Sequence, residues 1–386
     1  MNQVEEQTIV KIETLRRARR RKLRLRQFLL FSGIVAVLLC VLYLSDFLLN
    51  FDLSARVSDT FRSYGGPGFP VPAPGGIIRN VYPMGQNLAV LNDTNLIVYN
   101  RRGRVITNIQ QMTGNSMAIT SRDRILTYEY GGRRVQIHST GRELFTHSFE
   151  DMVLGAALGE GGEYAIVTSP RNFIAAVAAY NSRHAMMMQW FSSDQYVLGA
   201  AVAPRGDMMA IACIDSDGGV LKSDLYFLRF GMESPAAEVS LEGELVVWLS
   251  FISPDRLAVL TDRSYRVYDS VGRSQGVYPL PDALMSFESD GERMLLLCGA
   301  REARERQLIL LDWQARETAS AMIPGRVTDM AIAGRGIWLV IDEAAARYDL
   351  SLEHTGVLDE PHIRHVEYAA GRIYYFTNDM IFVLEG

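Results

Sequence analysis

The side chains best suited to bind a metal ion are sparse in this sequence. The chain has six histidines and three cysteines. His362 and His365 are three residues apart in a segment that we expect to be a strand. Side chains at that spacing point to opposite faces of a strand. We therefore expect no shared metal ion at this pair.

An acidic, glycine-rich stretch over residues 215–219, Asp-Ser-Asp-Gly-Gly, resembles the start of a calcium-binding loop. A loop of that type needs an oxygen ligand at its fifth position and a glutamate at its twelfth. Gly219 and Tyr226 occupy those positions. We interpret the stretch as a loop of turn-forming residues that connects two strands.

The motifs of three large enzyme classes are absent. No Gly-x-Ser-x-Gly elbow, His-Glu-x-x-His helix or Gly-x-x-x-x-Gly-Lys loop occurs, so a serine hydrolase, a zinc protease and a P-loop NTPase lack support. A pair of catalytic carboxylates could still be assembled from distant segments, and the sequence does not locate one. The absence of a vicinal cysteine pair disfavours a quinone cofactor. We assign no catalytic, cofactor-binding or metal-binding residue and expect no cofactor.

Sulfur-containing residues indicate packing more than reactivity. Cys40 lies in an apolar segment near the N-terminus, whereas Cys213 and Cys298 lie in apolar, strand-like runs and should be buried as small hydrophobic side chains. Residues 186–191, Met-Met-Met-Gln-Trp-Phe, form a strand with apolar residues on both faces. Such a strand either exposes an adaptable surface for protein contacts or is covered by packing, and we prefer packing.

The N-terminal region predicts a membrane anchor. Residues 16–26 carry eight basic side chains and no acid, and Phe28–Ser45 is uncharged and mostly apolar. A helix of that length measures about 27 Å, close to the thickness of about 30 Å of a hydrocarbon core. Extended to Leu49, the segment predicts one span over residues 28–49, which would place the lipid bilayer among the partners. Because basic residues beside a span stay in the cytoplasm, residues 1–27 should lie inside and the rest outside.

Two other interpretations fit this region less well. A cleaved signal peptide has a shorter apolar core and small residues before the cleavage site, whereas Leu53 stands here where a small residue is required. The basic run could bind nucleic acid, but no base-reading motif accompanies it. We expect an uncleaved signal anchor in the cytoplasmic (plasma) membrane, and no nucleic acid partner.

Charge is distributed unevenly along the chain. The net charge is −5, and residues 1–27 hold nine Lys and Arg and three Glu, which is +6, so residues 28–386 carry −5 − 6 = −11. An acidic domain of this kind disfavours a polyanionic ligand by its bulk charge. Residues 50–76 follow the span and are rich in Gly and Pro, which predicts an extended tether.

Short apolar runs separated by turn residues recur over residues 77–386. Their starts fall near residues 77, 116, 152, 196, 244, 283, 326 and 362. A spacing of about 40 to 45 residues with four strands per unit is typical of a β-propeller. We predict an all-β fold with eight four-stranded antiparallel blades, and seven blades as the alternative. The last unit has only three strands, so residues of about 51 to 72 should supply its outer strand and close the ring.

The turns of these units carry a resemblance to known propellers. Ser253-Pro-Asp and Ser289-Asp-Gly resemble turns of the WD40-like and TolB-like group, and the Tyr-Asp/Asn-x-x-Gly-Arg turns that end at Arg104 and Arg273 resemble the quinoprotein-like group. The Gly-His and Trp-Asp pairs of true WD40 repeats are absent. In its layout the chain resembles an uncharacterised family of single-pass, membrane-anchored β-propeller proteins of Gram-positive bacteria, which implies a location and no activity.

The sequence favours a non-enzymatic role. We expect a binding or scaffolding module outside the membrane, with an envelope protein or glycan as partner, because variable loops gather on the two faces of a propeller. A wall-glycan or peptide hydrolase or lyase with acidic residues at the central channel is the alternative, and a transmembrane sensor is a further one. An enzyme should gather carboxylates with shifted pKa values at the channel, whereas a binding module should expose an apolar or aromatic patch.

Overall fold

The protein is described by a computed structural model. It describes residues 26–38, 40, 68–110, 115–358 and 360–385. The chain separates into two units, Met1–Ser54 and Ala55–Gly386.

The first unit contributes a helix over residues 26–38 that continues at residue 40, and its described side chains are exposed. No helix in the described part of the chain is both long enough and apolar enough to cross a membrane. Residues 39 and 41–49 of the predicted span over 28–49 lie outside the described residues, as do residues 1–25 and most of the tether. The described residues therefore do not support the predicted transmembrane helix.

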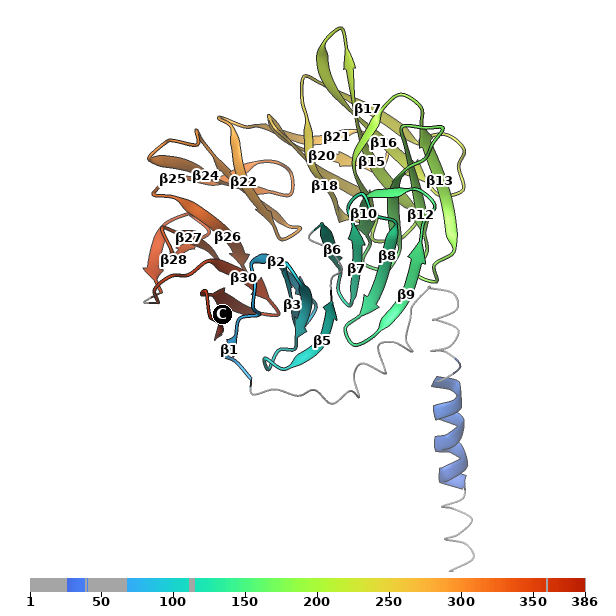
Figure 1. Ribbon diagram of the computed structural model, residues 1–386, viewed down its shortest axis with the longest axis horizontal. Coiled ribbons are helices and arrows are strands. Elements are labelled where there is room, and N and C mark those ends of the chain that lie inside the picture. The colour runs from blue at the N-terminus through green and yellow to red at the C-terminus, as the bar shows by residue number, and fades with distance from the viewer. Residues whose placement is uncertain (1–25, 39, 41–67, 111–114, 359, 386) are drawn as a thin grey trace, which may run out of the picture. The chain divides into compact units, whose positions relative to one another are not determined.

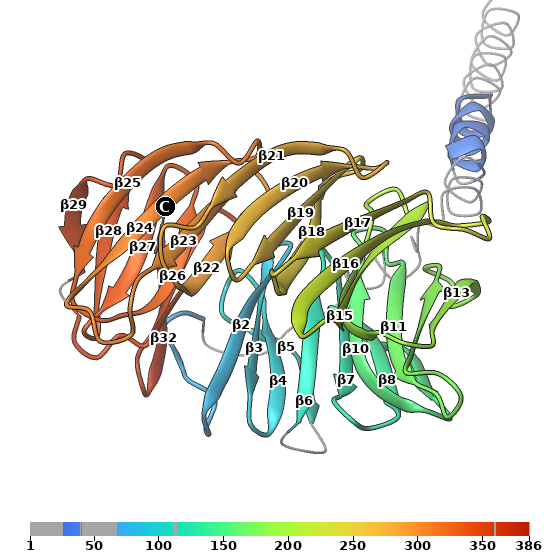
Figure 2. The same ribbon diagram turned by 90° about the horizontal axis from the view of Figure 1, so that it is seen from above.

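The second unit is a ring of eight four-stranded antiparallel sheets, so the prediction of eight blades is confirmed and the seven-bladed alternative is wrong. Figure 1 shows the sheets arranged around a central axis, and Figure 2 shows them from the side. The blades, numbered along the chain and given from inner to outer strand, are blade 1, β2 (Ile78–Met84), β3 (Asn87–Asn92), β4 (Asn95–Tyr99) and β5 (Val105–Gln110); blade 2, β6 (Ser116–Thr120), β7 (Arg124–Glu129), β8 (Arg134–Ser139) and β9 (Glu143–Ser148); blade 3, β10 (Met152–Leu158), β11 (Tyr164–Ser169), β12 (Ala175–Tyr180) and β13 (Met186–Ser192); blade 4, β14 (Tyr196–Val202), β15 (Met208–Asp217), β16 (Val220–Arg229) and β17 (Ala237–Glu242); blade 5, β18 (Val246–Ser253), β19 (Arg256–Thr261), β20 (Ser264–Asp269) and β21 (Ser274–Pro279); blade 6, β22 (Leu284–Ser289), β23 (Arg293–Cys298), β24 (Glu305–Asp312) and β25 (Glu317–Pro324); blade 7, β26 (Val327–Ala333), β27 (Gly336–Ile341), β28 (Ala344–Asp349) and β29 (His354–Val357); and blade 8, β30 (His365–Ala369), β31 (Arg372–Phe376), β32 (Met380–Glu385) and β1 (Val71–Pro72).

The ring closes as the sequence predicts. Val71 and Pro72 pair with Ile381 and Met380, so a strand from the N-terminal side completes the blade built by the C-terminal strands. Val71 is only 3% exposed, and the Phe69 ring packs against Tyr374 with their centroids 5.3 Å apart. Residues 51–67 of the predicted donor segment lie outside the described residues.

The core lies between neighbouring blades. One cluster joins Leu295 and Leu308 of blade 6 to Met330 and Leu339 of blade 7. Because each sheet is covered on both faces, its middle strands are apolar on both faces and do not alternate. Cys213 and Cys298 are free and completely buried in such strands, as predicted.

The recurring Tyr-Asp turns have a local physical cause. The Asp269 carboxylate accepts hydrogen bonds from the backbone N–H groups of Val271 and Arg273, at 3.0 and 2.8 Å. Asp312 and Asp349 make the equivalent bonds, and all three residues end the third strand of a blade. A carboxylate at this position satisfies two N–H groups of the turn to the outer strand, so the motif marks the blades.

The stretch over residues 215–219 differs from its prediction. Residues 215–217 continue β15, and only Gly218 and Gly219 form the turn to β16. Both glycines have positive φ angles, 57° and 86°, as a tight two-residue hairpin requires. The acidic residues therefore belong to a strand of a long hairpin.

Candidate functional site

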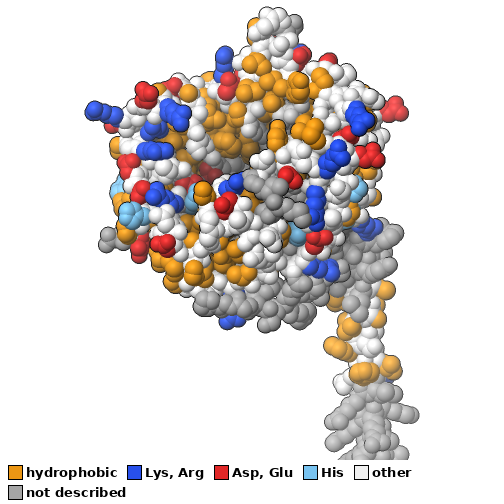
Figure 3. Space-filling view, viewed as in Figure 1, with side chains coloured by type: hydrophobic (Ala, Val, Ile, Leu, Met, Phe, Trp, Pro, Cys, Tyr) orange, Lys and Arg blue, Asp and Glu red, His pale blue; other side chains and the backbone are white. Residues whose placement is uncertain are grey.

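The innermost strands of the blades surround the central channel (Figure 1). In blades 4, 5 and 6 the inner strand shifts register near its start, and the shift leaves Leu198, Val247 and Met285 without a cross-strand partner. These three side chains are 40%, 45% and 39% exposed. We call them the apolar arc. Figure 3 shows one face of the ring, hollowed near its centre and with hydrophobic side chains around part of the hollow.

Three carboxyl groups, the acid trio, come from the inner strands of blades 6, 7 and 8: Glu288, Asp329 and Glu367. Burial raises the pKa of Glu288 to about 8, and the charge of Asp329 adds to the effect. Burial, followed by the charges of Glu288 and Asp329, raises the pKa of Glu367 well above its usual value. Both glutamates should hold their protons at neutral pH.

Each member of the trio lies on the inner strand of its blade, opposite a residue of the second strand. Glu288 pairs with Leu295, Asp329 with Val340 and Glu367 with Tyr374. Asp329 Oδ2 accepts a hydrogen bond from the Val366 N–H at 2.8 Å, which ties blade 7 to blade 8.

The raised pKa of Glu288 predicts a dependence of stability on pH. Between pH 4.5, the usual value, and about 8, folded Glu288 keeps a proton that the unfolded chain releases, so stability falls as the pH rises. In Glu288→Gln this loss should disappear, and the variant should gain about 2 kcal/mol relative to wild type between pH 4.5 and pH 8; the full shift would give more, but the side chain keeps some contact with solvent. Urea unfolding across this range measures the difference.

The matched control for that measurement is Glu292→Gln, because Glu292 is exposed in the turn that follows β22. Its unfolding curves should follow those of the wild type at every pH. Parallel pH profiles for the wild type and Glu288→Gln would show that Glu288 is not protonated in the folded state.

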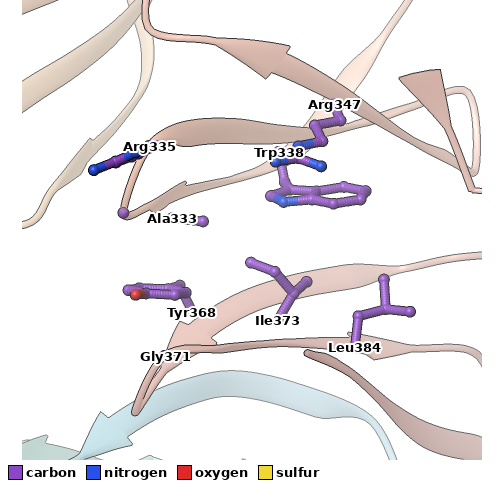
Figure 4. Close-up of a pocket in the computed structure, with 9 residues that line it drawn as sticks. Ala333, Arg335, Trp338, Arg347, Tyr368, Gly371, Ile373 and Leu384 are labelled. Atoms are coloured by element: carbon purple, nitrogen blue, oxygen red, sulfur yellow. The ribbon is translucent and has the colours of Figure 1, made fainter. Parts of the chain in front are cut away.

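A groove of about 560 Å³ opens between blades 7 and 8. Figure 4 shows Trp338 and Arg347 on the wall formed by blade 7, facing Ile373 and Leu384 of blade 8. The Arg347 guanidinium lies 6.0 Å from the centroid of the Trp338 ring. We call this cavity the blade 7–8 groove. Its remaining lining residues belong to the two inner hairpins: Ala333, Gly334, Arg335, Tyr368 and Gly371.

The groove combines apolar walls with uncompensated positive charge. No aspartate or glutamate lines it, and neither Arg335 nor Arg347 has a carboxylate partner among the described residues. Some other arginines of the ring are paired, as Arg316 is with Asp312 at 2.8 Å. Such a groove suits a ligand with an apolar body and a negatively charged group.

The methionine-rich stretch fits both of its interpretations in part. It forms β13, the outer strand of blade 3. Met187, Met188 and Trp190 pack against the core between blades 3 and 4, which confirms packing for these three. Met186 and Phe191 are 58% and 43% exposed.

His362 and His365 contact different carboxylates. His362 precedes the strand in which it was expected, with a φ angle of 61°, and its Nδ1 lies 2.7 Å from Glu343 Oε2. His365 begins β30, and its Nδ1 lies 3.4 Å from Asp329 Oδ2. In the described residues no group of three or more His, Cys, Asp or Glu is arranged to hold a metal ion.

Sequence reasoning assigned no site residue and so missed both the acid trio and the groove. A signal existed for the trio, because Glu288 and Glu367 are acids in apolar inner strands. None existed for the groove, whose walls come from strands that only the ring brings together.

Comparisons with known proteins agree with this fold. Residues 77–356 match the model of a family of unknown function, DUF5711. No curated protein matches the chain. The C-terminal WD40 domain of Sif2 is similar, with a TM-score of 0.55 and 11% identity over 81% of this chain and 100% of that one.

Two further solved structures share the architecture. BamB from Moraxella catarrhalis gives a TM-score of 0.50 and 10% identity over 82% of this chain and 100% of that one. The dihydro-heme d1 dehydrogenase NirN, in complex with DHE, gives 0.58 and 13% over 81% and 73%. Likenesses at such low identity establish the fold alone.

Proposed function

Because the chain belongs to the DUF5711 family, whose function is unknown, we propose a function from its own geometry: it is a non-enzymatic binding module. The blade 7–8 groove is the recognition site. Its ligand is a polypeptide segment in which a carboxylate lies next to an aromatic or aliphatic side chain.

The observation that carries this proposal is the composition of the groove. Trp338, Ile373 and Leu384 offer apolar surface to a side chain that enters between the blades. Arg335 and Arg347 have no described carboxylate to neutralise them, and a guanidinium group binds a carboxylate through two parallel hydrogen bonds. Tryptophan and arginine are also the residues that contribute most to binding at protein interfaces.

The location that we propose rests on the sequence. The basic run over residues 16–26 and the apolar segment over 28–45 support an anchor in the cytoplasmic membrane, with the ring outside. A ring held there would meet the exposed segments of other envelope proteins. A scaffolding role in the envelope follows from both parts of the proposal.

Peptide selection on the purified full-length chain tests the groove. Selected peptides should share an acidic residue adjacent to an aromatic or aliphatic one. Trp338→Ala and Arg347→Gln should each weaken the binding of a selected peptide at least tenfold, which corresponds to about 1.4 kcal/mol. The first substitution removes the apolar contact, and the second removes a partner of the peptide carboxylate. Isothermal titration calorimetry measures the change.

The chain provides a matched control. Arg256 stacks over Trp313 with its Cζ 4.0 Å from the ring centroid, and neither residue lines the groove. Arg256→Gln and Trp313→Ala should leave peptide affinity unchanged. Peptides that bind Trp338→Ala as tightly as the wild type would contradict the proposal.

A second candidate function is a hydrolase or lyase acting on envelope glycans or peptides. The acid trio favours it, because glycoside hydrolysis uses two carboxyl groups, one of which keeps its proton, as the raised pKa of Glu288 allows. Turnover of a wall glycan that Glu288→Gln abolishes and Trp338→Ala leaves intact would favour this candidate over binding in the groove.

A further inference from the structure

A second cavity, of about 850 Å³, lies between blades 6 and 7. Four arginines line it: Arg301, Arg304, Arg306 and Arg326. We call it the arginine pocket. Met285 of the apolar arc also lines it, so the pocket opens beside the channel.

The arginine pocket and the blade 7–8 groove lie at opposite ends of the blades. Arg301 and Arg304 are in the connection from β23 to β24, and Arg326 is in the connection from β25 to β26. Arg335, which lines the groove, is in the connection from β26 to β27. Because successive antiparallel strands reverse direction, these two kinds of connection fall at opposite ends of a blade. The pocket is therefore separate from the proposed recognition site.

Arg306 links the two connections that form the pocket. Its side chain is buried, with 7% of the residue exposed. Its Nη1 donates a hydrogen bond to the Gly325 carbonyl at 2.9 Å, and its Nη2 donates one to the Arg301 carbonyl at 2.8 Å. The Gly325 N–H donates to the Arg304 carbonyl at 3.1 Å. The two loops are thus fixed to each other, which keeps the exposed arginines near one another before any ligand binds.

The pocket holds more positive than negative charge. No aspartate or glutamate lines it, and no described residue forms an ion pair with the guanidinium group of Arg301, Arg304 or Arg326. One carboxylate is near, because the Arg326 backbone N–H donates a hydrogen bond to Asp342 Oδ1 at 3.2 Å. Solvated arginines on a surface need no ligand, but four that share one cavity repel one another, and a bound anion relieves that repulsion. This concentration of positive charge stands out because residues 28–386 carry a net charge of −11.

We propose that the arginine pocket binds the phosphate group of a ligand. A phosphate group suits several guanidinium groups better than a single carboxylate does, because it offers more oxygen atoms and up to two negative charges. Each arginine can donate a pair of hydrogen bonds to it. The bulk acidity of the domain disfavours long polyanions, whereas a compact phosphate needs only the local field of the pocket.

Calorimetric titration of the full-length chain with inorganic pyrophosphate tests the proposal. Binding should weaken as salt increases. The double variant Arg304→Gln/Arg326→Gln, which leaves the buried Arg306 in place, should bind at least tenfold more weakly than the wild type. Urea unfolding should show that the variant keeps its stability, because both side chains are exposed.

The control is Arg205→Gln/Arg229→Gln in blade 4, which makes the same change in net charge at two exposed residues that line neither the pocket nor the groove. It should bind pyrophosphate as the wild type does. Equal weakening in the two double variants would overturn the proposal, because it would reduce the effect to net charge. No binding to the wild type would overturn it directly.

Two probes distinguish the sources of the phosphate. Glycerol 1-phosphate carries the group alone, and short-chain phosphatidylglycerol, used below its micelle concentration, carries it next to an apolar chain that could contact Met285. Tighter binding of the lipid would assign the pocket to a lipid headgroup, and equal binding would assign it to a free phosphate ester. Failure of both probes to bind would overturn the proposal. The proposal does not depend on the groove, since Trp338→Ala should leave all these affinities unchanged.

Discussion

Val71→Asp should lower the free energy of unfolding by about 3 kcal/mol, because it places a charge in a buried position without a partner. Val71 is 3% exposed in the cluster where Leu88 of blade 1 and Phe376 of blade 8 meet. Its strand is only two residues long, so no neighbouring pair can compensate. The loss should appear in urea unfolding of the full-length chain as a lower transition midpoint.

Val357→Asp is the control for this result. Val357 also lies on an outer strand, β29 of blade 7, but it is 58% exposed. The same substitution there should change stability by no more than about 0.5 kcal/mol. If the two variants unfolded at the same urea concentration, the short strand β1 would not be what closes the ring.

A second large effect is expected at Gly276, where two blades approach closely. A Cβ atom added there would lie 2.0 Å from the carbonyl oxygen of Gln314 in blade 6. That backbone is held in place, because the Gln314 N–H donates a hydrogen bond to Asp312 at 2.8 Å. Gly276→Ala should therefore lower the free energy of unfolding by about 3 kcal/mol, the cost of forcing blades 5 and 6 apart.

Gly356→Ala provides the comparison, since Gly356 lies on the outer strand of blade 7 and an added Cβ meets nothing within 4 Å. Its thermal midpoint should stay close to that of the wild type. A midpoint for Gly276→Ala equal to that of Gly356→Ala would mean that blades 5 and 6 separate without strain.

The sequence predicts the architecture well because each blade repeats the same local chemistry. The turn pattern predicts that units start at residues 116, 152 and 196, and β6, β10 and β14 start there. The largest shift is in the last unit, which starts at His365 instead of 362, because the Ile363 N–H bonds to the Glu343 carbonyl in the connection before β30. Local turns and strand lengths suffice to count the blades.

The sites could not be predicted in the same way. Trp338 and Leu384 face each other in the groove although 46 positions separate them (384 − 338), and only the packing of blade 8 against blade 7 brings them together. The exposure of Met285 depends on a register shift that the sequence pattern does not reveal. The arginine pocket is likewise formed by two separate connections, from β23 to β24 and from β25 to β26. The net negative charge of the domain disfavours a polyanionic ligand and so does not indicate this pocket.

The pairing of Val71 with Ile381 has a consequence for how the molecule is made. The partners are 310 positions apart (381 − 71), so β1 emerges early and must wait for nearly the whole ring to be synthesised. Until then the sheet edge of blade 8 does not exist, and contacts of such long separation form slowly. A chain whose synthesis stops before β32 has nothing for β1 to bind. Closure of the ring by β1 is therefore possible only in chains that have been translated through β32.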